Sequence, residues 1–339
     1  MQQHLLVPSE RSGIELDEFL CLQYPLLNKG FLRRQVREGS VLVDGQPGRV
    51  SQRLKIDQVI SIGFDVESAP PAPAPPPKAL AILHEDEAVM VIDKPDGVAV
   101  EPERWARDLG CVSGALLQMA LERSGSDGSD PLDFRPRLVH RIDKDTTGCL
   151  LVAKTIEAER GLREAFKDGR VQKSYLALVE GEHPLADGEE QRIEWQIAAD
   201  RRRSGKMRAA ESGGKASTTV VSVERRFQGF TLMRAAPLTG RTHQIRVHLS
   251  AAGFPLVVDP LYGRRTQIAL SEFKRGYRPK RGREELPLMN RLTLHAHRLR
   301  FPDLAPGAPE GAVCEVVSDL PKDFERLLTQ LAKVRPSRR

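Results

Sequence analysis

The stretch RLVHRIDKDTTGCLLVAKT, residues 137–155, joins two apolar runs through a short, highly charged segment. Within nine residues, His140–Gly148 contains two carboxylates, two hydroxyls, an Arg, a Lys and a His. Apolar runs separated by polar residues and a Gly are typical of two strands joined by a turn. The sequence therefore predicts a strand, a polar turn and a second, buried strand.

The neighbouring segments repeat this hairpin-like pattern. The pattern at residues 80–97 predicts two strands joined by an acidic turn. One strand is predicted at residues 173–181. At residues 230–255 the pattern predicts a strand, a turn and a helix that ends at Gly253. Residues 156–169 predict a further helix with a Gly stop. Strands joined by tight turns, with intermittent helices, indicate an α+β fold with a mixed, largely antiparallel sheet.

The composition is that of a globular protein. The chain has 339 residues, 40% hydrophobic and 29% charged, which favours two folded units. No apolar run approaches the roughly 20 residues of a membrane helix, and the first residues lack a secretory pattern. We therefore expect a cytoplasmic protein with no membrane association. We also expect a monomer.

Two familiar kinds of site are disfavoured by spacing. The four cysteines form no CxxC or Cys/His metal spacing, so we expect reduced thiols and no metal. The segment ESGGKAS, residues 211–217, lacks the leading Gly and the final Ser/Thr after Lys of a phosphate-binding loop. It predicts a flexible loop instead.

The sharpest boundary is the proline-rich segment ESAPPAPAPPPK, residues 67–78. Such a run favours an extended, semi-rigid spacer. We therefore expect a small α/β domain at 1–66, a linker at 67–78 and a catalytic domain at 79–335.

Positive charge is clustered in the small domain. The net charge is +6 with a pI near 9.2, and a predicted helix carries a basic stripe of Lys29, Arg33, Arg34 and Arg37. Such a stripe is usually a solvated face, but without opposing acids four residues away it favours phosphate contacts. Nucleic acid is therefore the expected partner. Residues 13–62, from LDEFL through NKGFLRRQVREGSVLVDGQ to RLKIDQVI, resemble an S4-like RNA-binding domain, which implies RNA.

A second polar cluster, GRTHQIRVH at residues 240–248, contains side chains that could contact the charged turn. On a helix, His243 and Arg246 share one face, and an Arg there could meet an Asp of the turn. Such a pair would keep a carboxylate ionised and oriented for nucleophilic or general-base work. The alternative is a structural turn in which Asp145 and the Thr hydroxyls bind backbone amides.

Five segments, taken together and in order, resemble the motifs of the RluA-type pseudouridine synthases. They are HEDEAVMVIDKPDGVAV, RLVHRIDKDTTGCLLVAKT, KSYLALVEG, PLTGRTHQIRVHLSAAGFPLVVDPLYG and LHAHRLRF, and they span about residues 81–301. The resemblance implies an isomerase that flips a uridine out of structured RNA and converts it to pseudouridine, with no cofactor. It implies that Asp143 is the catalytic aspartate, that Arg141 fills the space of the flipped base, that Tyr175 lies against the base and that Arg246 pairs with Asp143.

The substrate stays open within this family. An amino-terminal RNA-binding domain joined to such a core favours large-subunit rRNA over tRNA. A non-catalytic RNA-binding or ribosome-assembly factor is the main alternative from another class, although Asp143 is present. A nucleoside glycosidase would be expected to need a second positioned acid.

Overall fold

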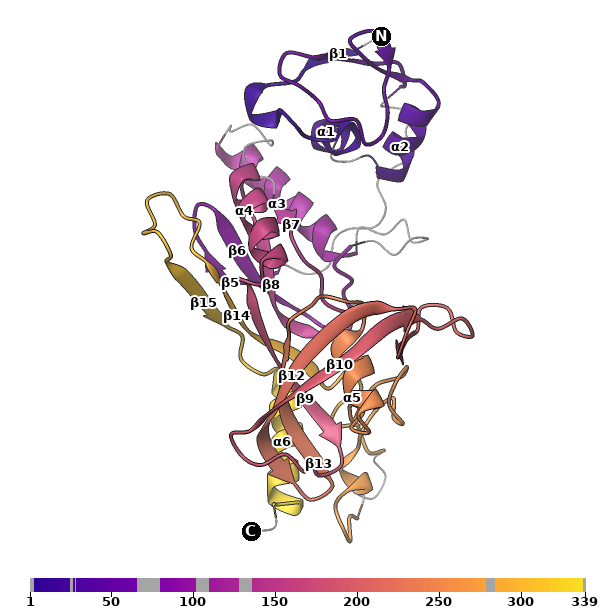
Figure 1. Ribbon diagram of the computed structural model, residues 1–339, viewed down its shortest axis with the longest axis vertical. Helices are drawn as coiled ribbons and strands as arrows, with labels where there is room; N and C mark the ends of the chain where they lie inside the picture. Colours follow the sequence, from indigo (N-terminus) through magenta and orange to yellow (C-terminus); the bar gives the residue numbers. More distant parts are fainter. Residues whose placement is uncertain are drawn as a thin grey trace. The chain divides into compact units, whose positions relative to one another are not determined.

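The computed structural model describes residues 3–24, 27, 29–65, 80–101, 110–127, 136–278 and 284–337 (Figure 1). The chain divides into two compact units, one made of residues 1–77 and 101–135 and the other of residues 78–100 and 136–339. Residues 101–135, which the sequence assigns to the catalytic domain, thus group with the first unit. The predicted linker at 67–78 lies outside the described residues. No helix in the described ranges is long and apolar enough to cross a membrane.

The first unit contains a four-stranded antiparallel sheet of order β1-β4-β2-β3. Its elements are β1 (Gln3–Leu6), η1 (Ser9–Arg11), α1 (Leu16–Gln23), α2 (Lys29–Arg37), β2 (Val41–Val43), β3 (Gln46–Pro47), β4 (Val59–Ile62) and α3 (Val112–Asp127). The β2–β3 turn places Asp44 and Gly45 at positive φ, as a two-residue hairpin turn requires. Leu16, Phe19 and Leu20 of α1 are fully buried in the core of the unit.

The second unit is built on a large sheet of order β11-β10-β12-β13-β9-β14-β8-β6-β5, with β15 paired to β14 and β7 paired to β8. Its strands are β5 (Ala81–Glu85), β6 (Val89–Lys94), β7 (Arg137–Leu138), β8 (Thr147–Ala153), β9 (Gln172–Glu180), β10 (Glu190–Ala199), β11 (Met207–Ala210), β12 (Lys215–Phe227), β13 (Phe230–Pro237), β14 (Leu294–Pro302) and β15 (Val313–Val317). All of its strand pairs are antiparallel except β8 with β14. The predicted mixed, largely antiparallel α+β fold is confirmed.

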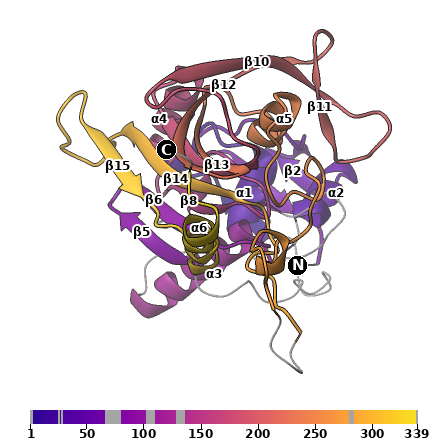
Figure 2. The same ribbon diagram turned by 90° about the horizontal axis from the view of Figure 1, so that it is seen from below.

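The helices cover different parts of this sheet. They are α4 (Ile156–Lys167), α5 (Gln244–Ala251), α6 (Lys322–Val334) and the short η2 (Leu270–Glu272). Helix α4 begins where the Thr155 side chain accepts the amide of Ala158, and it packs on β8 and β14. Helix α5 packs on β10, β11 and β12 (Figure 2), and α6 buries Phe324 and Leu331 in a second core.

One local prediction holds only in part, since residues 211–214 lie outside the strands but the residues after them do not. Residues 215–217 of the expected flexible loop begin β12, where Lys215 pairs with Ile197 and Ser217 with Trp195 of β10. Extended pairing satisfies the backbone of this polar segment, so a lack of apolar side chains does not make it a loop.

Candidate active site

Two carboxylates bind one guanidinium at the start of α5. Arg246 donates from Nη1 to Oδ2 of Asp143 at 2.9 Å. It also donates from Nε and Nη2 to the two carboxylate oxygens of Asp259, each at 2.8 Å. The Asp259 and Arg246 side chains are 0% and 6% exposed, whereas that of Asp143 is 22% exposed. Asp143 is therefore the member of the trio that solvent, or a substrate, can reach.

The negative charges of Asp143 and Asp259 stabilise the positive charge of Arg246. Burial lowers the pKa of Arg246, but hydrogen bonding to Asp259 and the charges of both carboxylates raise it above its ordinary value. Arg246 therefore stays protonated and supplies a fixed positive charge to Asp143. An oriented, ionised carboxylate can act as a nucleophile or as a general base.

Tyr262 holds the start of α5 in place. Its hydroxyl accepts the amide N–H of Met207 at 2.7 Å and lies 2.8 Å from Nδ1 of His243. His243 has a φ of 56° and a ψ of 22°, the left-handed conformation, immediately before the helix begins. The Tyr262 ring also lies 5.0 Å from the Arg246 guanidinium carbon. This ring therefore links the helix start to strand β11 and packs against the ion-pair network.

The turn that bears Asp143 is held by a buried lysine. The amide of Thr146 donates to the carbonyl of Asp143 at 3.1 Å, which closes the turn. Lys94, with 0% exposure, donates from Nζ to the carbonyls of Pro95, Val98 and Lys144 at 2.7–2.8 Å. Burial lowers the pKa of Lys94 to about 8, against the opposing charges of nearby aspartates. Lys94 thereby ties the loop after β6 to the turn before β8.

The start of β8 makes a close contact with β14. Gly148 has a φ of 104°, and a Cβ atom there would lie 2.3 Å from the carbonyl oxygen of Ala296. The preceding Thr147 hydroxyl lies 2.9 Å from Nδ1 of the fully buried His295. Only Gly fits this position, which explains the Gly that closes the charged turn.

The other catalytic-domain residues predicted from the sequence take different environments. Tyr175 on β9 is 8% exposed, between Ala235 of β13 and Ala296 of β14 in the sheet register. Burial raises the pKa of Tyr175, and the nearby charge of Asp143 contributes in the same direction. Arg141 is exposed, on the loop just before Asp143. Arg246 thus binds Asp143 directly, Tyr175 lies close enough for the Asp143 charge to act on its hydroxyl, and Arg141 lies at the surface.

The basic stripe lies on α2 of the first unit. Arg34 and Arg37 are exposed, and the Arg34 guanidinium lies 5.5 Å from the centre of the Phe31 ring. Arg33 instead donates from Nε to Oδ2 of the fully buried Asp17 at 2.7 Å. Lys29 is the first residue of α2, and its side chain lies outside the described part. Arg33 therefore has a structural partner within the unit that the helix pattern alone does not reveal.

Sequence reasoning missed three residues of this site: Asp259, Tyr262 and Lys94. Asp259 and Tyr262 lie in the segment VVDPLYG, where an Asp follows an apolar run and precedes a Pro. Lys94 lies in the segment VIDKPDG, at the end of an apolar strand. A charged residue at the end of an apolar run is the signal that could have identified Asp259 and Lys94, because such a charge needs a partner. Tyr262 carries no such signal.

Comparisons with known proteins identify the family of this chain. Residues 88–251 match the family model described as RNA pseudouridylate synthase. The chain is 32% identical to ribosomal large subunit pseudouridine synthase D of Neisseria meningitidis serogroup B, over 96% of this chain and 81% of that protein. It is also 32% identical to ribosomal large subunit pseudouridine synthase C of Escherichia coli K12, over 97% of this chain and 96% of that protein.

A solved structure shows the same core. Human RNA pseudouridylate synthase domain containing 4 superposes with a TM-score of 0.55 at 25% identity, covering 74% of this chain and 92% of that chain. The predicted resemblance is confirmed, and the chain belongs to the RluA-type RNA pseudouridylate synthase family.

Proposed function

We propose that this protein converts specific uridines of large-subunit ribosomal RNA to pseudouridine, with Asp143 as the catalytic group. The substrate class rests on relatives whose names specify the large ribosomal subunit. Relatives named C and D share the same 32% identity with this chain, so identity favours neither of their targets. Transfer RNA is the alternative substrate.

The observation that carries the catalytic proposal is the 2.9 Å bond between Arg246 Nη1 and Asp143 Oδ2. Through this bond the protonated Arg246 fixes one oxygen of the Asp143 carboxylate. The carboxylate is partly exposed, so it can still face a substrate. The carboxylate attacks the anomeric carbon of the ribose or removes the proton from its 2′ carbon. Either route breaks the N-glycosidic bond, after which the uracil turns and its C5 bonds to the anomeric carbon. That bond displaces the Asp143 carboxylate on the first route, and on the second route the 2′ carbon regains its proton. C5 then loses its proton and N1 gains one, so the reaction is an isomerisation.

Two further residues complete this proposal. A base must leave its stack before reaction, at a cost of a few kcal/mol that contacts in the enzyme offset. Tyr175, buried beside Asp143, would lie against the flipped uracil. Arg141, exposed on the loop before the aspartate, would enter the helix and occupy the vacated space.

RNA binding is proposed to extend beyond the catalytic unit. Residues 1–66 would form an S4-like domain joined by the 67–78 linker to the catalytic domain at 79–335. On α2, Arg34 and Arg37 are exposed and suited to backbone phosphates. Lys29 belongs to the same proposed surface, while Arg33 would contribute while bound to Asp17. The expectations of a cytoplasmic monomer and of no cofactor stay predictions.

The test is pseudouridine mapping by carbodiimide-dependent reverse-transcription stops. Purified protein would be incubated with unmodified large-subunit rRNA and, separately, with bulk tRNA. We expect new stops in rRNA that are absent with Asp143→Asn and present with Asp145→Asn, which removes the same charge from the same turn. Filter binding should show that Asp143→Asn still binds rRNA.

The remaining outcomes discriminate among the alternatives. Stops only in tRNA would replace the proposed substrate class. Activity retained by Asp143→Asn would refute the catalytic assignment. Tight rRNA binding without any stops would favour the assembly-factor function.

A further inference from the structure

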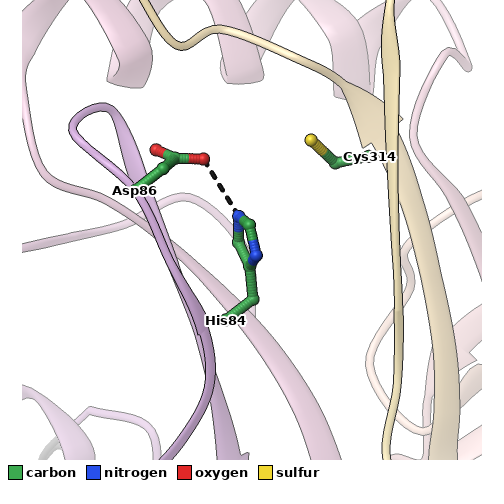
Figure 3. Close-up of side chains that lie close together, drawn as sticks. All are labelled: His84, Asp86 and Cys314. Carbon is green, nitrogen blue, oxygen red and sulfur yellow. Dashed lines mark hydrogen bonds and ion pairs between the residues drawn. The ribbon is translucent and has the colours of Figure 1, made fainter.

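Three possible metal ligands converge at the edge of the second unit, on elements that the proposed reaction does not use. His84 lies on β5, Asp86 lies in the turn between β5 and β6, and Cys314 lies on β15 (Figure 3). One ligand atom from each residue lies within 4.8 Å of the other two. The three side chains point toward a common space. This cluster combines nitrogen, oxygen and sulfur donors.

The Asp86 carboxylate is already oriented. Its Oδ1 accepts the amides of Ala88 and Val89, both at 2.7 Å, while Oδ2 lies 3.0 Å from Nε2 of His84. The two backbone amides hold Oδ1, so Oδ2 is the carboxylate oxygen that faces His84. Hydrogen bonds of this kind commonly orient carboxylates that bind metals.

Cys314 supplies the sulfur donor of the cluster. Its Sγ lies within 4.8 Å of a ligand atom of His84 and of one of Asp86. A divalent cation would bind the thiolate directly and offset the charge of the neighbouring carboxylate.

We propose that His84, Asp86 and Cys314 bind one divalent ion of the zinc class, with water in the fourth position. Zinc takes tetrahedral nitrogen, oxygen and sulfur ligands at about 2.0–2.3 Å, so donor atoms should lie about 3.3–3.6 Å apart. The present spacings are 3.0 Å between Nε2 of His84 and Oδ2 of Asp86 and at most 4.8 Å within the cluster. Small side-chain rotations would adjust them, because the side chains of His84 and Asp86 are 33% and 21% exposed. Binding forms a metal–sulfur bond and releases the thiol proton to solvent.

The ion would link the β5 edge of the sheet to β15. Among the described strands of the sheet, β5 lies at an edge and β15 pairs with β14 alone. A metal bound to residues of both would tie these margins together, which adds binding free energy to the folded state. The proposal concerns stability at this edge and does not depend on the proposed catalytic role of Asp143.

Cobalt substitution provides the test. Chelator-treated, full-length protein would be titrated with Co²⁺, and thiolate-to-cobalt charge-transfer absorption would be recorded. We expect saturation at one equivalent, loss of the band in Cys314→Ser, and affinity weakened at least about tenfold in His84→Gln. The controls Cys111→Ser and His4→Gln remove a thiol and an imidazole from the first unit and should leave the titration unchanged.

A second measurement needs no substitution. Saturating Zn²⁺ should protect Cys314 of the wild-type protein from alkylation, read by peptide mass spectrometry, and should raise the melting temperature. Equal alkylation with and without Zn²⁺, or no charge-transfer band in the wild type, would overturn the proposal. Since both readouts report metal binding, neither failure would bear on pseudouridine formation.

Discussion

Asp259 binds two of the three guanidinium nitrogens of Arg246 and leaves the third for Asp143. Oδ1 of Asp259 also accepts the amides of Leu261 and Tyr262, which fixes the carboxylate to its own loop. The position of the Arg246 Nη1 group is therefore set by a fully buried residue. Orientation of a reacting group through a fixed neighbour is a common source of catalytic precision.

Asp259→Asn should lower the turnover rate more than it lowers RNA affinity. The amide side chain cannot accept both hydrogen bonds from Arg246. The guanidinium is then no longer fixed by residue 259, and its hydrogen bond to Asp143 is weakened. Breaking a buried pair of this kind should also cost about 3 kcal/mol of stability or more. Single-turnover kinetics under conditions where the variant is fully folded would measure the first effect.

Asp323→Asn is a matched control for that variant. Asp323 forms the same two-bond pair, with Arg291, at 2.7 and 2.8 Å. It should lose stability while its single-turnover rate, measured on folded protein, stays near that of the wild type. Equal rate losses in the two variants would show that the Asp259 effect is general destabilisation.

Gly148→Ala should destabilise the second unit strongly. The positive φ and the 2.3 Å approach to the Ala296 carbonyl leave no room for a methyl group, so we expect a loss of at least about 3 kcal/mol. Gly213→Ala is the control, because its φ of 74° is also positive but nothing lies within 4 Å of the added Cβ. It should cost only about 1–2 kcal/mol in urea unfolding. Equal losses would assign the whole effect to backbone strain.

Stability should fall in acid partly through His140. Its Nε2 accepts the amide of Leu151 at 2.9 Å, and burial, aided by the charge of Lys173, lowers its pKa to about 3. The unfolded chain therefore takes up this proton first, so stability is lost as pH falls from about 6.5 toward 3.

His140→Gln keeps an acceptor but cannot titrate. In urea unfolding between pH 7 and pH 4, it should reduce the slope of stability against pH by up to about 1.4 kcal/mol per unit. The exposed His4, replaced by Gln, is the control. An unchanged slope in His140→Gln would show that the ring accepts its proton in the folded protein as readily as in the unfolded chain.

The basic residues of α2 should differ in whether their replacement affects RNA binding alone or also the stability of the first unit. Arg34→Gln and Arg37→Gln should weaken RNA binding and reduce its salt dependence by about 0.7–0.9 per lost phosphate contact, without loss of stability. Arg33→Gln should also cost about 1–3 kcal/mol of stability, because the buried Asp17 loses its ion pair. Arg163→Gln, on α4 of the second unit, makes the same charge change and controls for net charge. RNA affinity unchanged in Arg34→Gln and Arg37→Gln would remove α2 from the proposed surface.

Local sequence patterns predicted many of the individual elements. The hairpin at Asp44–Gly45, the β5–β6 and β7–β8 pairs and α4 followed from turn residues, apolar periodicity and a Gly stop. Strands β10 to β12 were not predicted, because their many exposed polar residues conceal the alternation that marks a strand. Their pairing depends on backbone hydrogen bonds between segments, which side-chain composition reports poorly.

The sequence by itself determined the family, through the order and composition of its motifs, and it gave Asp143 and Arg246 as predicted site residues. The tertiary structure alone decided how Arg246 divides its nitrogens between two carboxylates, how Lys94 holds the aspartate turn, and that His84 and Asp86 meet Cys314. The physical reason is distance along the chain. Turns, caps and periodicity act over a few residues, whereas Asp143 and Arg246 are 103 residues apart and meet only through the packing of the sheet.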